Sequence, residues 1–128
     1  MERVTGIGGI FFKAHSPKEL QAWYERHLGL VPDGDGYITF RWREDRDPNR
    51  PGHTVWSTFA ETTTYFEPST RPFMINYRVE NLDRMLAQLQ HAGVTVDPHR
   101  EESVYGRFAW IMDPEGNRIE LWEPPPTP

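Results

Sequence analysis

The stretch that decides the fold runs from residue 108 to residue 124 and reads FAWIMDPEGNRIELWEP. Its two ends are apolar and aromatic, whereas its middle, Asp113–Asn117, combines proline and glycine with Asp and Asn. Proline fixes φ, glycine tolerates positive φ, and Asp and Asn side chains bond back to the backbone, so this middle predicts a tight turn. We therefore expect a strand over 106–112, the turn, and a last strand over 118–122.

The residues before this hairpin predict a strand and a helix. Positions 73–79 alternate between two faces, with Ile75, Tyr77 and Val79 on one and Met74, Asn76 and Arg78 on the other. Asn81 can cap a helix whose apolar side chains recur at helical spacing and which stops at Gly93. A short strand and a polar turn follow.

The first half of the chain repeats this order. Residues 7–14 read as a strand, Ser16 and Glu19 form the pattern of a capping box, and Gly29 stands where a helix ends. The segments that follow are 37–43 and 53–60, which read as strands, and 61–72, which reads as an irregular connection or a weak edge strand.

The two halves therefore look like an internal duplication. An offset of 65 residues places Ala14 on Val79, and an offset of 64 places Gly29 on Gly93. If each helix covers the apolar side of its strands, the two mixed sides face inwards and make a cup. We expect one α+β domain over residues 1–128, with a first module at about 5–60, a connection at 61–72 and a second module at about 73–124.

The sequence resembles the vicinal oxygen chelate superfamily of glyoxalase I, bleomycin resistance proteins and extradiol dioxygenases. The resemblance is carried by residues 9–30, by 77–94, and above all by 108–124 with its Asp113-Pro-Glu-Gly-Asn-Arg-Ile-Glu-Leu121 motif. It implies two βαβββ modules that form an open, barrel-like mixed sheet with the helices on the outer face. It also implies a homodimer and a small-molecule ligand.

Enzymes of this superfamily hold a divalent metal such as Mn, Fe, Ni, Co or Zn on the first and last strands of the two modules. The resemblance puts the four ligand positions at Gly9, Trp56, Met74 and Glu120, of which only Glu120 carries a metal ligand of the family. A catalytic site normally needs about three protein ligands. We therefore expect no complete metal site and no cofactor, with a divalent metal as the alternative if a shifted register brings in His53.

The inward sides offer a mixture of aromatic and polar groups that suits a small-molecule pocket. The expected binding residues are Phe11, Trp56, Met74, Asn76, Phe108, Trp110, Arg118 and Trp122, with Glu120 as the candidate catalytic residue. Two other interpretations stay open. The aromatic side chains can simply pack a core, and Arg118 and Glu120 can form an internal ion pair.

Composition excludes several classes of protein. The 14 Lys and Arg against 19 Asp and Glu, for a net charge of −5, do not form the basic footprint of a nucleic-acid binder. No stretch of about 18 apolar residues or secretory signal is present, so we expect a cytoplasmic protein without a membrane partner. The absence of cysteine removes thiolate metal sites and cysteine nucleophiles.

These observations leave three candidate functions. The first is a protein that binds an aromatic or planar small molecule without a complete metal site. The second is an enzyme, a metal-dependent lyase, isomerase or ring-cleaving dioxygenase of glyoxalase type, which Glu120 supports. The third, a purely structural interaction domain, has only the abundance of aromatic side chains behind it.

Overall fold

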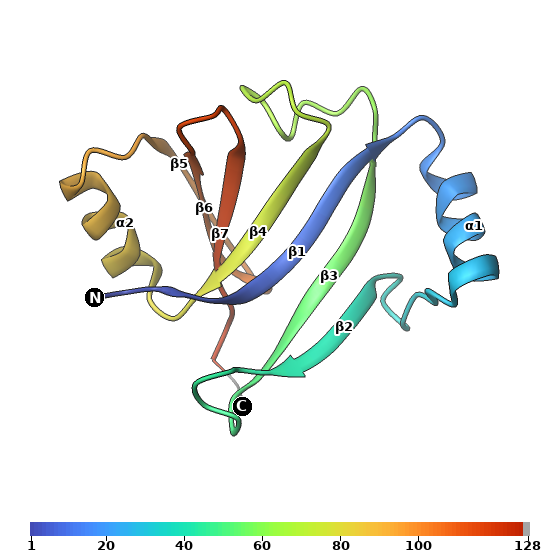
Figure 1. The fold of residues 1–128 in the computed structure, drawn as a ribbon, viewed down its shortest axis with the longest axis horizontal. Helices are drawn as coiled ribbons and strands as arrows, with labels where there is room; N and C mark the ends of the chain where they lie inside the picture. The colour runs from blue at the N-terminus through green and yellow to red at the C-terminus, as the bar shows by residue number, and fades with distance from the viewer. Residues whose placement is uncertain (127–128) are drawn as a thin grey trace.

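The computed structural model describes residues 1–126 and contains one seven-stranded sheet with two helices (Figure 1). The elements in chain order are β1 (Val4–Ala14), α1 (Pro17–Leu28), β2 (Ile38–Arg43), β3 (Pro51–Ala60), β4 (Phe73–Val79), α2 (Leu82–His91), β5 (Val96–Ser103), β6 (Gly106–Met112) and β7 (Arg118–Glu123). The strands are arranged in the order β2-β3-β1-β4-β7-β6-β5. None of these helices is long and apolar enough to cross a membrane.

The sheet is built from two halves joined at its middle. β1 and β4 pair antiparallel, β1 pairs parallel with β3, and β4 pairs parallel with β7. The predicted α+β class and the duplicated order are confirmed. The second half is a full βαβββ module, whereas the first has one strand fewer because residues 29–37, which contain Pro32 and turn at Gly34 and Gly36, form no strand.

Helix α2 covers the outer face of the second half. Asn81 caps it as predicted, because its side chain accepts a hydrogen bond from the Arg84 N–H. The cluster beneath it consists of Val79, Leu82, Met85, Leu86, Ala109 and Leu121. Tyr77 packs against this cluster, so the odd-numbered face of β4 is the outer one, as its alternation predicts.

Helix α1 packs more loosely on the outer face of the first half. None of its residues is fully buried, and its contact with the sheet is aromatic: the Tyr24 ring lies 4.7 Å from that of Trp56. The predicted capping box does not form, since the Ser16 side chain makes no capping hydrogen bond. Gly29 ends the helix in the left-handed conformation, at φ 69°, as expected.

A second cluster fills part of the inner face. Phe66, Met74 and Trp110 are buried there, with Phe11, Phe59, Tyr65 and Phe108 packed around them. Phe66 and Tyr65 belong to the connection between the halves, which therefore folds into the cup at one end. The remaining inner surface is open.

Candidate functional site

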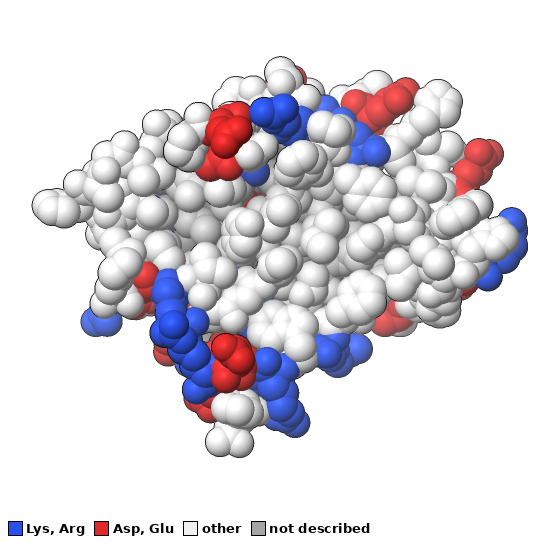
Figure 2. All heavy atoms as spheres, in the orientation of Figure 1, with Lys and Arg blue, Asp and Glu red and all other residues white. Residues whose placement is uncertain are grey.

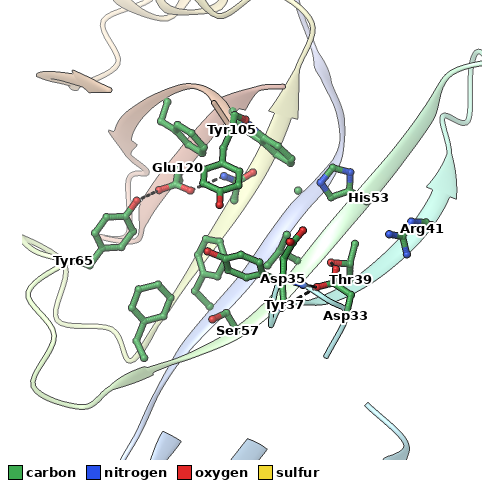
Figure 3. Close-up of a pocket in the computed structure, with 17 residues that line it drawn as sticks. Asp33, Asp35, Tyr37, Thr39, Arg41, His53, Ser57, Tyr65, Tyr105 and Glu120 are labelled. Atoms are coloured by element: carbon green, nitrogen blue, oxygen red, sulfur yellow. Dashed lines mark hydrogen bonds between the residues drawn. The ribbon is translucent and has the colours of Figure 1, made fainter. Parts of the chain in front are cut away.

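The inner face of the sheet holds a cavity of about 410 Å³ (Figure 3). It lies in the size range of small-molecule sites, roughly 300–1,000 Å³. Its lining comes from both halves: Gly8, Phe11, Asp33, Asp35, Tyr37, Thr39, Arg41, His53, Val55, Ser57, Phe59, Tyr65, Asn76, Tyr105, Phe108, Glu120 and Trp122. Most of this surface is aromatic.

Glu120 is the buried polar centre of this cavity, with 2 % of its surface exposed. The sheet register places it between Asn76 on β4 and Trp110 on β6. The Asn76 Nδ2–H donates to Glu120 Oε1 at 2.6 Å, and the Trp110 Nε1–H donates to Oε2 at 3.0 Å. Adjacent strands thus hold the carboxylate in a fixed position.

Tyr65 supplies a third hydrogen bond from outside the sheet. Its hydroxyl donates to Glu120 Oε2 at 2.5 Å, as Figure 3 shows. Its ring stacks on Phe59, with ring centres 5.6 Å apart, and its backbone carbonyl accepts from Arg118 Nη1. Burial, with the Glu120 charge beside it, raises the pKa of the Tyr65 hydroxyl far above its usual range, so this group stays a donor.

Glu120 has three neutral donors but no cation paired with it. Burial raises the pKa of the Glu120 carboxyl, and this effect exceeds the opposing effects of the hydrogen bonds from Tyr65, Asn76 and Trp110. Within residues 1–126 none of the ion pairs includes Glu120. Arg118 instead lies 3.6 Å from Asp97 and 5.0 Å from the centre of the Trp110 ring, so the suggested internal pair with Glu120 does not form.

The mouth of the cavity lies between the segment before β2 and the turn between β5 and β6. Asp33 organises the first of these, since its Oδ1 accepts from the backbone N–H of Asp35 at 3.0 Å and of Tyr37 at 3.1 Å. The rings of Tyr37 and Tyr105 meet across the mouth with centres 6.4 Å apart. The segment that is not a strand therefore serves as part of the cavity rim.

Two basic side chains lie on the β2–β3 side of the cavity, Arg41 and His53 (Figure 3). Burial lowers the pKa of His53, and the neighbouring Arg78 and Arg41 charges lower it further. His53 is therefore a neutral ring at pH 7, and its ring centre lies 5.2 Å from that of Trp122. In the face shown in Figure 2, charged side chains gather near the upper and lower margins and the middle is uncharged.

The structure brings part of the predicted site together. The predicted residues that line the cavity are Phe11, Asn76, Phe108, Glu120 and Trp122, together with His53. Met74 and Trp110 face inwards but are buried behind the lining, and Arg118 lies over Trp110 beyond it. Gly9 lies beneath the Phe11 ring.

Trp56 lies on the opposite side of the sheet from the expected one. Its ring packs on Phe12 and Tyr24, beneath helix α1. The offset of 64 residues that assigned it as the counterpart of Glu120 is off by one, and one residue reverses the face of a strand. Phe11 pairs with Ser57 as Asn76 pairs with Glu120, so Ser57 is the counterpart that lines the cavity.

The side chains around Glu120 do not fit a divalent metal. Asn76, Tyr65 and Trp110 direct N–H and O–H groups at the carboxylate, which is how donors satisfy an anion in place of a cation. Over the described residues 1–126, no group of three or more His, Asp or Glu side chains is placed to hold a metal ion. His53 lines the cavity without joining such a group.

Sequence reasoning missed most of the rim and one central residue. Tyr65 lies in a segment that reads as an irregular connection, and the aromatic pair Tyr65-Phe66 in that polar stretch is the signal that it folds back onto the sheet. Tyr37 and Tyr105 lie next to glycine-containing turns, where an exposed aromatic ring at a loop marks a binding surface. The missed cavity residues of the strands are Thr39, Val55, Ser57 and Phe59.

Comparison with solved structures shows the same fold in enzymes and in proteins named only by superfamily. A Streptomyces coelicolor methylmalonyl-CoA epimerase variant in complex with 2-nitronate-propionyl-CoA is 16 % identical, with a TM-score of 0.66 over 98 % of this chain and 100 % of that one. The Mycobacterium tuberculosis methylmalonyl-CoA epimerase is 21 % identical, with a TM-score of 0.60 over 96 % and 90 %. A glyoxalase/bleomycin resistance protein/dioxygenase superfamily member from Vibrio splendidus is 11 % identical, with a TM-score of 0.56 over 96 % and 99 %.

These identities are low, so the structural likeness shows the fold alone. No curated protein sequence matches this chain. The glyoxalase-like domain family matches residues 9–122, which is nearly the whole molecule. The predicted resemblance to the vicinal oxygen chelate superfamily is thereby confirmed, and the chain belongs to the glyoxalase-like domain family.

Proposed function

We propose that this protein binds an aromatic or planar small molecule in the cavity of its curved sheet, without a complete metal site. The observation that carries the proposal is the composition of the cavity wall. Phe11, Phe59, Phe108 and Trp122 supply flat apolar surface around one buried carboxylate. Rings that provide contact area and a single polar group that fixes orientation are typical of small-molecule sites.

Calorimetric titration tests the proposal with three naphthalene probes that share one ring system: 2-naphthylmethylamine, 2-naphthylmethanol and 2-naphthoate. We expect at least one of them to bind with a Kd tighter than about 1 mM. Ser57→Trp places a large ring in the cavity and should weaken that binding by at least about tenfold. Ala60→Trp, at the exposed end of the same strand, is the matched control and should bind as the natural protein does.

Two results would reject the proposal. One is that none of the three probes binds. The other is that Ser57→Trp, correctly folded by circular dichroism, binds as tightly as Ala60→Trp.

Glu120 also favours a second candidate, a metal-dependent enzyme of glyoxalase type, because it matches the family's glutamate ligand. The neutral donors that surround Glu120 support the metal-free proposal instead. Metal analysis of protein purified without chelator separates the two candidates. We expect no stoichiometric Mn, Fe, Ni, Co or Zn; a full equivalent of one of these that is lost in Glu120→Ala would favour the enzyme.

We further propose a homodimer. The outer face of β1 lies between the two helices and leaves Ile7 and Ile10 exposed by 44 % and 40 %. Apolar side chains at the centre of a sheet are commonly covered by a partner. Light scattering after size-exclusion chromatography should give twice the 15.0 kDa mass of the chain, and a monomer at all concentrations would reject this proposal.

A further inference from the structure

The polar groups that face the cavity differ in one respect: those at its floor accept hydrogen bonds and have no cation to balance them. We infer that the cavity takes an organic cation, a protonated amine carried on an aromatic or planar body. This inference rests on the proposed function, because it names the class of ligand that the same site selects.

The first step concerns hydrogen bonding at the floor. The Asn76 side chain is 2 % exposed and points its Nδ2–H at Glu120, which leaves Asn76 Oδ1 buried with no hydrogen-bond partner in residues 1–126. Gly8 lines the cavity beside this oxygen, and a Cβ at residue 8 would overlap it. The floor therefore keeps space next to an acceptor that needs a donor.

The carboxylate has the same requirement. Glu120 Oε2 accepts from both Tyr65 and Trp110, whereas Oε1 accepts only from Asn76. A carboxylate oxygen can accept about two hydrogen bonds, so Oε1 has room for one more. An ammonium group has three donors and no acceptor, which complements Oε1 and Asn76 Oδ1 together.

Charge points in the same direction. The ionisable side chains in the lining are Asp33, Asp35, Glu120, Arg41 and His53, and the last of these is neutral at pH 7. Carboxylates thus outnumber cations around the cavity by three to one. Arg78 does not line it, because its guanidinium is stacked between Trp42 and Trp122, 5.1 and 5.8 Å from their ring centres.

The walls provide the second means of holding a cation. Phe11, Phe59, Tyr65 and Phe108 surround the floor, and the faces of aromatic rings attract positive charge. A bare carboxylate between rings also discriminates against anions, since a second negative charge would add to one that is already unpaired. Neutral aromatic molecules gain the ring contacts but leave Oε1 and Asn76 Oδ1 without donors.

The three naphthalene probes test this inference, because they differ only in the charge of one substituent. At pH 7.5 the natural protein should bind the cation 2-naphthylmethylamine at least about tenfold more tightly than neutral 2-naphthylmethanol, and should bind 2-naphthoate most weakly. Glu120→Gln should remove the preference for the amine over the alcohol and leave alcohol binding within about threefold. Glu115→Gln, at an exposed position of the turn before β7, is the matched control and should keep the preference.

The ranking in the natural protein decides the matter even if Glu120→Gln fails to fold. Equal binding of amine and alcohol, or tighter binding of the acid, overturns the inference and leaves the proposed function standing. Binding of none of the three overturns both. A preference for the amine that persists in folded Glu120→Gln overturns the assignment of Glu120 as its cause.

Discussion

At the scale of single residues, the cavity depends on a carboxylate that the protein satisfies with neutral donors. Removing a charged group from water costs several kcal/mol unless hydrogen bonds or a counter-charge replace the water. Tyr65, Asn76 and Trp110 provide the hydrogen bonds, and no side chain provides the counter-charge. Glu120 is thus a position where folding stability is sacrificed for a polar group that faces a cavity.

The pH dependence of stability should reveal this cost. The pKa of Glu120 lies near 4.5 in the unfolded chain and is raised by burial in the folded one, so the folded protein holds the proton more tightly. The stabilisation by the protonated carboxyl is complete below about pH 4.5 and is lost as the pH rises through the raised folded pKa.

We therefore expect the natural protein to lose stability relative to Glu120→Gln as the pH rises from about 4.5 to 7.5. Urea unfolding at several pH values measures the difference between the two, in which the other carboxyl groups cancel. Tyr65, Arg118 and Asn76 face Glu120, and Asp33, Asp35, Arg41 and His53 share its cavity; all of these remain in both proteins. A difference that is independent of pH would contradict the raised pKa.

Tyr65→Phe should destabilise the protein by about 1–3 kcal/mol at pH 7, because it removes a hydrogen bond to a buried charged acceptor. Tyr105→Phe is the control: its ring is exposed at the mouth, and the change should stay within about 0.5 kcal/mol. Urea unfolding measures both variants. Equal effects of the two changes would show that the Tyr65 hydroxyl contributes nothing to the folded state.

At the scale of helices and strands, the two halves are related in order but unequal in packing. Helix α2 buries Leu82, Met85 and Leu86 against the sheet, whereas α1 buries no residue fully. Exposed aromatic and aliphatic side chains on and after α1 include Trp23, Leu28 and Val31. The second half therefore contributes most of the core, and the first half forms much of the cavity rim.

Truncation in the two helices should reflect this inequality. Met85→Ala should cost about 2–5 kcal/mol, since it opens a cavity in the cluster beneath α2. Leu28→Ala, at an exposed position of α1, should change stability by no more than about 0.5 kcal/mol. Chemical denaturation of the two variants provides the check, and comparable losses would mean that α1 is packed as firmly as α2.

The sequence predicts most elements because their signals are local. Ser16 and Gly29 bracket α1, Asn81 caps α2, and the Asp113–Asn117 turn separates β6 from β7. The inner position of Asn76 follows from alternation within one strand. Each of these signals lies within a few residues of the feature that it predicts.

The rest of the site depends on long-range pairing. Trp56 was placed on the inner face by counting from the other half, and a difference of one residue in loop length reversed its side. Tyr65 reaches Glu120 across 55 residues through a connection without regular structure. No periodicity within that segment indicates which of its side chains turns inwards.

At the scale of the whole molecule, the central claim is that the concave face binds the ligand and the convex face does not. The five tryptophans report on this, because they are divided between the two faces. The Trp110 indole N–H donates to Glu120 at the cavity floor, and that of Trp122 donates to the Tyr105 carbonyl at 2.7 Å near the mouth. Trp23 and Trp56 belong to the outer side, with helix α1.

The most direct measurement is a two-dimensional ¹H–¹⁵N NMR titration with whichever naphthalene probe binds most tightly, following the assigned indole N–H signals. The signals of Trp110 and Trp122 should move or broaden as the probe is added, while those of Trp23 and Trp56 stay in place. Movement of the Trp23 and Trp56 signals with Trp110 and Trp122 unchanged would contradict a binding site inside the curved sheet.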